Sequence, residues 1–549
     1  MNKKLFLGGL VLSFLAISCS DNQDDFDEQE YTQERFNINN SAANLKNEVS
    51  LDGAGVLSIS SITALKKGKQ QVEEEPQVAN IALEQIATVA SPVINGTTLR
   101  ASHVDIDGDY AYVTYMVEGN DYLGGIDIIN ISDRTNPVVE SRVTSEIADF
   151  TSAFFQNGKL YFSSAVNNDE LLTLDSRANL GMVSIDNGKF SEDFEFKSIP
   201  GYVAVDIAGF ENTIIGVSGD VGVLGLYDLV SLEMQNEIEL PDLRSVAYSN
   251  GKIAVLTGGN ALGIYDASSL AELNTINTPN LTGASKRTIA FKNQNILVSE
   301  GENGVGIYNT NSGSEILHLP IQIAPNAEYD EKDIVTNAVS IADDFILMAN
   351  GGAGFGISRL DENNTLIEEG IVDLEGSSNY VQSDGEYIFV ASGLGGLRII
   401  KMSTANRAET EFTSCESYEV YNGKSNVNIN PNEEEAYQGI ATLKHLNVGG
   451  KFTFCGTLNI QKSTNINSEG EINIRGAMAV GTFGKNDDLS INSNAVLRVE
   501  GNLTVYGNLN LQSGATLEFV GEDSSLKVYG KIKQNSGSQI TGNYIDISN

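Results

Sequence analysis

Few side chains in this 549-residue sequence have the type and spacing that catalysis requires. It holds three His and three Cys, and it has no nucleophile elbow, phosphate-binding glycine loop, His-Glu-x-x-His or Cys-x-x-Cys pattern. The histidines, His103, His318 and His445, are far apart in the chain, which argues against a shared metal centre. We therefore expect no catalytic residues, no metal site and no cofactor.

One acidic segment over residues 105–109, Asp-Ile-Asp-Gly-Asp, is superficially similar to a calcium-binding loop. Its glycine is misplaced for such a loop and the distal Glu is missing. The segment also falls where one expected strand turns into the next. We expect a plain β-turn here, with calcium binding as the alternative.

The chain carries 73 Asp and Glu against 34 Lys and Arg, a formal net charge of −39. Nucleic acid is not expected as a partner, because phosphate binding requires clustered basic residues. Arg244 and Arg287 occupy matching positions in two repeats, and two converging arginines are suited to bind an anionic group bidentately. The alternative is that both pair with neighbouring carboxylates.

The elements that would position these residues come from an internal repeat. A glycine followed by an apolar residue opens an alternating strand seven times, at intervals of 38 to 56 residues. Each copy follows another β-rich run, and most have a tight-turn sequence such as Asn157-Gly158. About four strands per unit predict a seven-bladed β-propeller, with residues 80–92 completing the last blade; an open stack of sheets is the alternative. The seven glycines are Gly125, Gly181, Gly225, Gly263, Gly306, Gly356 and Gly396.

Propeller geometry predicts where a ligand would bind. The first strand of each blade lines the channel, and the loops between second and third strands share a face with the blade-to-blade connections. Alignment of the blades places one column near that face: Ser102, Thr151, Arg244, Arg287, Asn337 and Ser378. Loops on the same face add rim candidates whose composition suits carbohydrate or peptide: Asp121, Tyr122, Asn260 and Glu302.

The first unit resembles a known family. His103-Val-Asp-Ile-Asp-Gly-Asp-Tyr-Ala-Tyr-Val, followed by Gly125-Ile-Asp-Ile-Ile-Asn-Ile-Ser-Asp-Arg-Thr-Asn-Pro137-Val-Val, is similar to the LVIVD repeat of bacterial extracellular propellers. Later units, over residues 145–402, keep the Gly-apolar strand but lose the Ser-Asp-x-x-Asn-Pro turn. The resemblance implies a propeller on an exported protein and implies no catalytic residues.

A second repeat begins near residue 427 with the pattern apolar-x-apolar-x-Gly-x-apolar-x-apolar. Strict alternation turns one side of every strand inward. Rungs of about 25 residues with glycine at the bends predict a parallel β-helix or related solenoid, with a small β-sandwich or jelly roll as the alternative. The central glycines are 26, 25 and 29 residues apart: Gly450, Gly476, Gly501 and Gly530.

Cys415 and Cys455 are the two cysteines that follow the N-terminal region. In an oxidising envelope they would close a 41-residue loop and stabilise the fold by about 3–4 kcal/mol. Two free thiols are the alternative, because nothing in the sequence fixes their distance.

The N-terminus indicates export. Two lysines precede an apolar run over residues 5–17, which is too short to span a bilayer. Residues 16–19, Ala-Ile-Ser-Cys, resemble a bacterial lipobox, which implies cleavage before Cys19 and acylation of its thiol, for example by palmitate. An ordinary signal peptide is the alternative. The acidic stretch after Cys19 resembles the export signal of Bacteroidetes-type surface lipoproteins, which implies an outer-membrane protein facing the exterior; a plain solvated tether is the alternative.

These patterns predict an all-β chain in five parts: signal peptide 1–18, acidic tether or linker 19–78, propeller 79–405, linker 406–435 and solenoid 436–549. We expect a lipid-anchored surface protein without enzymatic activity, a recognition, adhesion or scaffold module. Its propeller face would bind a glycan, a peptide or an envelope protein. The alternative is a propeller lyase or glycosidase acting on extracellular polysaccharide through carboxylates about 5–10 Å apart.

Overall fold

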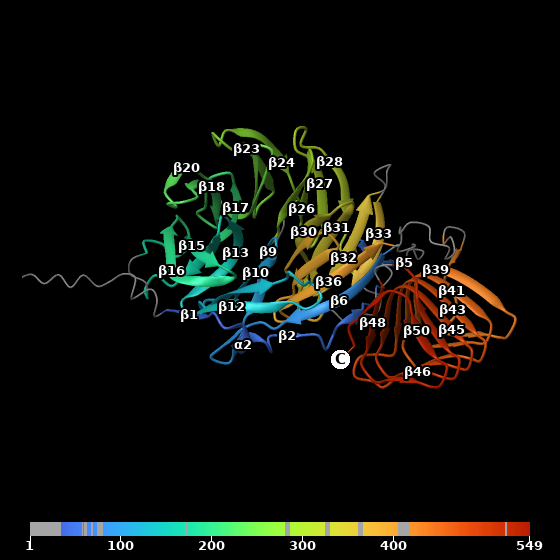
Figure 1. Cartoon of the computed structure of the whole chain (residues 1–549). Helices are drawn as coiled ribbons and strands as arrows, with labels where there is room; N and C mark the ends of the chain where they lie inside the picture. Colours follow the sequence, from blue (N-terminus) through green and yellow to red (C-terminus); the bar gives the residue numbers. More distant parts are fainter. Residues whose placement is uncertain are drawn as a thin grey trace, which may run out of the picture.

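The computed structural model is all-β and consists of a seven-bladed propeller followed by a parallel β-solenoid, as the two repeats predict (Figure 1). The described part of the chain contains two short helices, α2 (Ala42–Leu45) and the 3-10 helix η1 (Glu331–Asp333). The structure describes residues 35–57, 59, 63–66, 70–73, 81–170, 174–279, 286–323, 330–360, 366–404, 415, 418–521 and 524–548.

Each blade is an antiparallel sheet, and the first strands of successive blades contact one another around a closed ring, back from the seventh blade to the first. Blades 1 and 2 comprise β9 (Arg100–Asp107), β10 (Tyr110–Met116), β11 (Gly124–Asn130), β12 (Val138–Ser145), β13 (Ala148–Gln156), β14 (Lys159–Val166), β15 (Ala178–Asp186) and β16 (Lys189–Ser198). Blades 3 and 4 comprise β17 (Ala204–Phe210), β18 (Thr213–Ser218), β19 (Val223–Asp228), β20 (Met234–Glu239), β21 (Leu243–Ser249), β22 (Lys252–Thr257), β23 (Ala261–Asp266) and β24 (Glu272–Asn277). Blades 5 and 6 comprise β25 (Ile289–Lys292), β26 (Asn295–Ser299), β27 (Val305–Asn309), β28 (Glu315–Leu319), β30 (Ile334–Ala342), β31 (Phe345–Gly351), β32 (Phe355–Leu360) and β33 (Leu366–Val372).

The expected hairpin turns are formed by the residues that the sequence offers for them. Asn157 and Gly158 have φ of 53° and 79°, and Asn250 and Gly251 have φ of 48° and 76°. Both central residues of a type I′ turn need positive φ, which Asn and Gly tolerate. The turns therefore set the register of the first two strands in these blades.

The ring closes with a strand from the N-terminal side of the propeller, as predicted. Blade 7 comprises β34 (Tyr380–Asp384), β35 (Tyr387–Ala391), β36 (Leu397–Thr404) and β6 (Ile81–Val89). Strand β6 pairs antiparallel with β36 from Val89↔Leu397 to Ile81↔Thr404. Its other edge pairs with β2 (Val49–Ser50) and β3 (Gly55–Val56), so part of the last sheet edge is covered.

Residues 36–56 belong to the propeller, which corrects the expected tether of 19–78 over this stretch. Strand β1 (Phe36–Asn39) pairs antiparallel with β12 and extends blade 1. The apolar side chains of Phe36 and Leu45 are buried against the blades, and their burial holds the segment in place. The remainder of the expected tether up to residue 34 lies outside the described residues.

A buried ion pair ties the same segment to blade 1. The guanidinium of Arg142 donates to the Asp127 carboxylate at 2.6 and 2.8 Å, and Asp127 is fully buried. Arg142 also donates to Glu48 at 2.9 Å, and the Tyr115 hydroxyl donates to Asp127 at 3.0 Å. Every charge in this group therefore has a partner of opposite sign.

Two small sheets lie outside the blades. One pairs β7 (Val93–Ile94) with β8 (Thr97–Thr98). The other joins β29 (Gln322–Ile323) to β4 (Thr63–Lys66), which pairs with β5 (Gln70–Glu73).

The solenoid consists of two sheets whose neighbouring strands are all parallel. Its core starts with Val427 and Ile429, which are buried, so the solenoid begins near residue 419, inside the range 406–435 expected as linker. The first sheet contains β37 (Glu419–Val420), β39 (Glu434–Leu443), β41 (Lys451–Ile460), β43 (Glu471–Val480), β45 (Val496–Val505), β47 (Thr516–Phe519), β48 (Ser524–Val528), β50 (Gln539–Thr541) and β51 (Tyr544–Asp546). The second contains β38 (Asn426–Ile429), β40 (His445–Val448), β42 (Thr464–Ile466), β44 (Leu489–Ile491), β46 (Leu509–Leu511) and β49 (Ile532–Gln534).

One glycine column runs up the first sheet, but two of its predicted members were wrong. The register aligns Gly439, Gly456, Gly476 and Gly501, so successive rungs advance by 17, 20 and 25 residues. A Cβ at Gly476 would lie 2.3 Å from the carbonyl oxygen of Gly456, and φ there is +126°. Only glycine fits this close approach. Gly450 and Gly530 lie instead in bends between strands.

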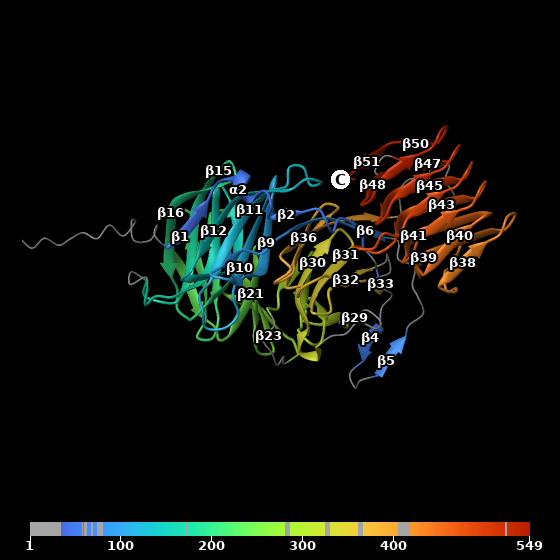
Figure 2. The same ribbon diagram turned by 90° about the horizontal axis from the view of Figure 1, so that it is seen from below.

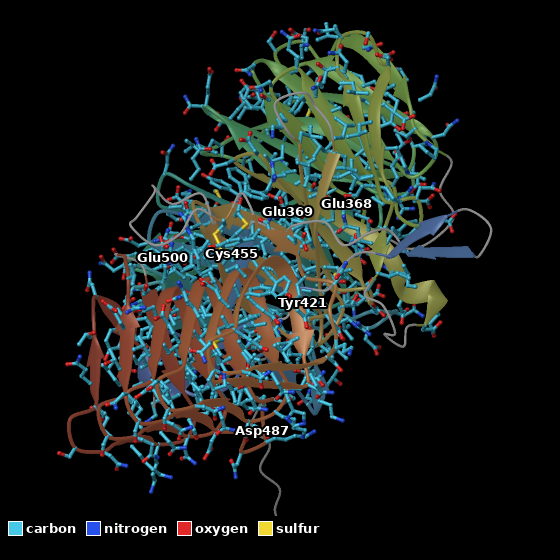
Figure 3. The ribbon with its side chains drawn as sticks, turned by 90° about the vertical axis from the view of Figure 1, so that its right-hand side faces the viewer. Glu368, Glu369, Tyr421, Cys455, Asp487 and Glu500 are labelled. Atoms are coloured by element: carbon cyan, nitrogen blue, oxygen red, sulfur yellow. A yellow bond between two sulfur atoms is a disulfide. The ribbon has the colours of Figure 1, made fainter. Side chains whose placement is uncertain are left out.

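Cys415 and Cys455 form a disulfide in the structure, with Cα atoms 6.0 Å apart (Figure 3). Cys455 lies in β41, so the bond fastens residue 415 to the first sheet of the solenoid.

The solenoid packs beside blade 7, and strand β6 lies at the junction (Figure 2). The Thr457 hydroxyl donates to the Ile81 carbonyl at 3.3 Å, and the Val56 amide donates to the Thr504 hydroxyl at 3.0 Å. The two domains therefore share hydrogen bonds that neither repeat pattern predicts.

Candidate functional site

A cavity of about 280 Å³ opens at one mouth of the propeller channel. It lies on the face of the β10–β11 loop, which contributes Glu118, as the alignment of the blades predicts. Its described lining contains three cations: Arg100, Arg244 and Lys286. Amide and hydroxyl side chains come from Asn337, Asn379, Ser102 and Thr151, and apolar ones from Met116, Val203 and Val205.

Bulges in the inner strands aim four of these side chains at the mouth. In blade 1, Thr114 pairs with His103 and Tyr115 with Ala101, so Ser102 is skipped in the ladder. A bulge leaves one residue unpaired and redirects its side chain, and such bulges are common beside binding sites. In blades 2, 3 and 4 the skipped residue also lines the cavity: Thr151, Val205 and Arg244.

Lys286 reaches across the mouth from blade 5. Its ammonium donates to the carbonyl oxygens of Ser102 at 3.0 Å and Thr151 at 2.9 Å. It also lies 5.1 Å from the centroid of the Tyr380 ring, within the range of a cation–π contact. Burial lowers the pKa of Lys286 to about 8, with the nearby Asp206 carboxylate opposing the shift. The side chain is therefore mostly charged at pH 7.

The two arginines in the lining are paired with carboxylates and remain partly exposed. Arg244 lies 2.8 Å from Asp242, and Arg100 lies 3.4 Å from Glu118. About a third of each arginine side chain is exposed, so an incoming anion can reach both guanidinium groups. Exposed pairs of this kind are weak, and a ligand anion can compete with them.

Arg287 does not join Arg244 in the mouth. It is 1% exposed, and both terminal nitrogens donate to the Gly258 carbonyl at 3.2 Å. Its φ of +56° turns the chain before β25, so the preceding residue, Lys286, enters the channel instead. Burial, and then the Arg244 charge, lower the pKa of Arg287. The expected pair of arginines is therefore replaced by Arg244 and Lys286.

A similar one-residue offset occurs in blade 7. Ser378 pairs through its backbone with Gly351, and its neighbour Asn379 lines the cavity. The Asn379 amide donates to the Ala101 carbonyl at 3.1 Å, which links the seventh blade to the first. Asn337 lies in the lining as expected and donates to the Ser378 carbonyl at 3.2 Å.

The expected rim residues lie in loops around the mouth but outside its described lining. Asp121, Asn260 and Glu302 are exposed, and Tyr122 is half-buried. Asp121 contributes to a raised pKa of about 7 at Asp149, whose main cause is burial. The structure thus separates a cationic mouth from a more acidic rim.

The acidic segment at 105–109 comprises the end of β9 and the turn to β10, and Asp105 accepts a hydrogen bond from the Phe155 amide at 2.8 Å. His103 is buried and packs against Tyr380, with ring centroids 4.0 Å apart. Burial and then the Lys286 charge hold the pKa of His103 well below its usual value. Among the residues that the structure describes, no group of three or more His, Cys, Asp or Glu is arranged to hold a metal ion.

The fold and the mouth define a propeller–solenoid protein with a cation-lined cavity. No family model and no curated protein matches the chain. Solved structures that resemble it in fold include the WD40 propeller domain of Doa1, with 10% identity over 57% of this chain and 96% of that one and a TM-score of 0.41. BamB from Moraxella catarrhalis has 11% identity over 65% of this chain and 100% of that one, with a TM-score of 0.39. The designed protein Ika8 has 11% identity over 64% and 100%, with a TM-score of 0.38.

Within the described ranges, no helix is long and apolar enough to cross a membrane. Cys19 and the expected signal peptide, residues 1–18, lie outside those ranges.

Proposed function

We propose that this chain is an exported lipoprotein whose propeller mouth binds an anionic group on an extracellular glycan, peptide or envelope protein. The solenoid acts as a spacer or as a second contact surface. The function is recognition or adhesion and requires no catalytic step.

The observation that carries the proposal is the charge of the mouth. In a chain of net charge −39, the described lining of this cavity holds Arg100, Arg244 and Lys286 against one carboxylate, Glu118. Arg244 and Lys286 come from neighbouring blades, 4 and 5, so they can contact one ligand group together. A carboxylate or sulfate would gain charge-assisted hydrogen bonds from both.

The same lining favours binding over glycoside cleavage. A glycosidase needs two carboxyl groups about 5–10 Å apart around the scissile bond. Among the described lining residues, Glu118 supplies the one carboxylate and is 70% exposed as a side chain. The described lining therefore offers no carboxyl pair to the lyase or glycosidase alternative, and the carboxylate of Asp242, beside the mouth, is paired with Arg244.

The anchor part of the proposal rests on sequence. Residues 16–19 resemble a lipobox, and the acidic residues that follow resemble a surface-export signal. Residue 35, where the described chain begins, lies 16 positions after Cys19. The acyl chains on Cys19 would hold the propeller at the outer membrane with its mouth available to extracellular ligands.

Binding is tested on an array that carries acidic and neutral glycans together with acidic and amidated peptides. The wild-type chain should bind the acidic glycans or peptides of the array. The double variant Arg244→Ala/Lys286→Met should not bind them. Binding should weaken as the pH rises through about 8, because Lys286 loses its proton there. The matched control Lys197→Met/Arg498→Ala removes the same charge from exposed or half-exposed ion pairs elsewhere and should keep binding.

The outcome that would overturn the proposed site is binding that survives the mouth variant or disappears equally in the control variant. The anchor is tested separately by expression in a Bacteroidetes host with labelled palmitate. Wild type should incorporate label and Cys19→Ala should not, and protease added to intact cells should degrade the wild-type propeller. Label in Cys19→Ala, or full protection from protease, would contradict the surface lipoprotein.

A further inference from the structure

A second cavity lies where the propeller meets the solenoid, away from the channel mouth. Its volume is about 290 Å³. Four parts of the chain line it: the segment before β4, the closing strand β6 with β36, the β11–β12 turn of blade 1, and the last rungs of the solenoid. Both domains therefore have to be docked for this cavity to exist.

The register of the solenoid explains why the junction opens here. Ala477, Asn502 and Ser525 occupy one ladder position on successive rungs. Ala477 belongs to one buried apolar cluster with Ala82 of β6. On the next rungs the larger, polar side chains of Asn502 and Ser525 line the cavity instead. The cavity thus begins where this apolar cluster ends.

Two buried polar side chains face this space. Glu84 of β6 is 2% exposed and accepts a hydrogen bond from the Ser525 hydroxyl at 3.0 Å. Asn502 is also 2% exposed, and its Nδ2 has no hydrogen-bond partner among the described residues. A buried amide donor without a partner costs free energy, which a ligand acceptor would recover.

Groups of both charge signs surround the cavity. Glu84 and Asp546 supply two carboxylates, and Lys401 and Lys527 supply two ammonium groups. Lys401 lies 3.3 Å from Glu386, and Lys527 donates to the Ile547 carbonyl at 2.8 Å. An anion would meet the carboxylates and a cation would meet the ammonium groups. A neutral ligand that both donates and accepts hydrogen bonds satisfies both sets.

The volume and the apolar lining of the cavity limit further which ligands can fit. The volume lies just below the range of roughly 300–1,000 Å³ typical of drug-sized ligand pockets. Ile86 and Leu51 add apolar surface beside the polar groups. One sugar ring matches this combination, because its hydroxyls donate to carboxylates and accept from amides while its C–H groups cover apolar side chains.

We propose that this interdomain cavity binds one neutral monosaccharide unit, with hydroxyls donating to Glu84 and one oxygen accepting from Asn502. The site is separate from the anionic-ligand site at the channel mouth. Its occupancy would stabilise the docked arrangement of propeller and solenoid, because both domains contribute contacts to it.

The test is calorimetric titration of the full chain with galactose, glucose, mannose and N-acetylglucosamine, and with galacturonate and galactosamine as charged counterparts. At least one neutral sugar should bind saturably, and the charged counterparts should bind roughly tenfold more weakly or not at all. Asn502→Ala and Glu84→Gln should each weaken binding by roughly 10-fold to 100-fold, because each removes a buried hydrogen bond to the ligand.

A rim variant keeps the proposal testable if the buried variants fail to fold. Asn136 is exposed at the rim of the cavity, whereas Ser132 is exposed in the same turn and does not line it. Asn136→Trp should abolish binding, and Ser132→Trp should leave it unchanged. Lys286→Met should also leave it unchanged, which separates this site from the channel mouth. No saturable binding of any neutral sugar up to about 50 mM, or binding that survives Asn136→Trp, would overturn the proposal.

Discussion

The Ser525 hydroxyl, in the solenoid, donates a 3.0 Å hydrogen bond to the Glu84 carboxylate, in the strand that closes the propeller ring. This contact joins two repeat architectures that the sequence presents as separate units. Burial raises the pKa of Glu84 to about 7, although Ser525, Lys401 and Lys527 favour its charged form. We therefore expect Glu84 to change its protonation state at the junction in the neutral pH range.

Glu84 should make the protein more stable in mild acid than at pH 8. An acid whose pKa is higher in the folded chain binds its proton more tightly there, so its contribution is full below about pH 4.5 and is lost as the pH rises to about 7. Glu84→Gln should raise the free energy of unfolding at pH 8 by roughly 1–3 kcal/mol and change it little at pH 5. Denaturant titrations of wild type and Glu84→Gln at both pH values measure this difference in the free energy of unfolding. Glu302→Gln, at an exposed position, is the control, and an equal effect of both variants would contradict the assignment.

Loss of the Arg142 charge should destabilise blade 1 strongly. Arg142→Met leaves Asp127 buried without its cation, which costs about 3–5 kcal/mol in comparable sites. The double variant Asp127→Asn/Arg142→Met should recover part of this loss, because no uncompensated charge remains. Thermal unfolding of the three proteins distinguishes these outcomes. A single variant as stable as wild type would show that the pair does not hold the N-terminal segment.

The glycine column should tolerate no side chain. In Gly476→Ala the new Cβ meets the Gly456 carbonyl, and the residue keeps an unfavourable φ of +126°, a strain of about 1–3 kcal/mol before the clash is counted. Gly484→Ala is the control, since Gly484 also has positive φ but nothing within 4 Å of an added Cβ. Gly476→Ala should lower the melting temperature of the solenoid more than Gly484→Ala. Equal effects would mean that contact between rungs does not require glycine.

The disulfide should stabilise the start of the solenoid. Cys415 and Cys455 are 40 positions apart, and closing a loop of this length contributes about 3–4 kcal/mol in the chain-entropy account. Cys415→Ser/Cys455→Ser should lose stability by up to that amount, and a reducing agent should affect wild type alone. Mass mapping of the non-reduced protein should find the two cysteines in one cross-linked peptide. Free thiols at both positions would contradict the bond.

The glycine and turn repeats were sufficient to predict the architecture, because residues such as Asn and Gly recur where the backbone must adopt a positive φ. Asn157-Gly158 specifies a turn with positive φ, and the ring needs seven such units and a closing strand. The rung length of the solenoid was predicted less well. Its glycine column depends on contacts between rungs, and rungs of 17 to 25 residues do not share one period.

The candidate site was predicted in part. The mouth, Ser102, Arg244 and Asn337 follow from alignment of the blades. Lys286 lines the mouth in place of Arg287 because Arg287 has a positive φ. An arginine in a sequence does not indicate that its φ will be positive. The interdomain contact had a weak signal: Ala477 and Ala479 stand at outward positions of a solenoid strand where polar side chains would suit solvent.

The most direct test of the account compares charged and neutral forms of one ligand at the channel mouth. Oligogalacturonate and its methyl ester, and an acidic peptide and its amidated form, are titrated against wild type and Lys286→Met. We expect the charged member of at least one pair to bind wild type roughly tenfold or more tightly than its neutral partner, and Lys286→Met to remove that preference. Equal affinity for both members of each pair in wild type, or a preference that persists in Lys286→Met, would contradict recognition of an anion at this mouth.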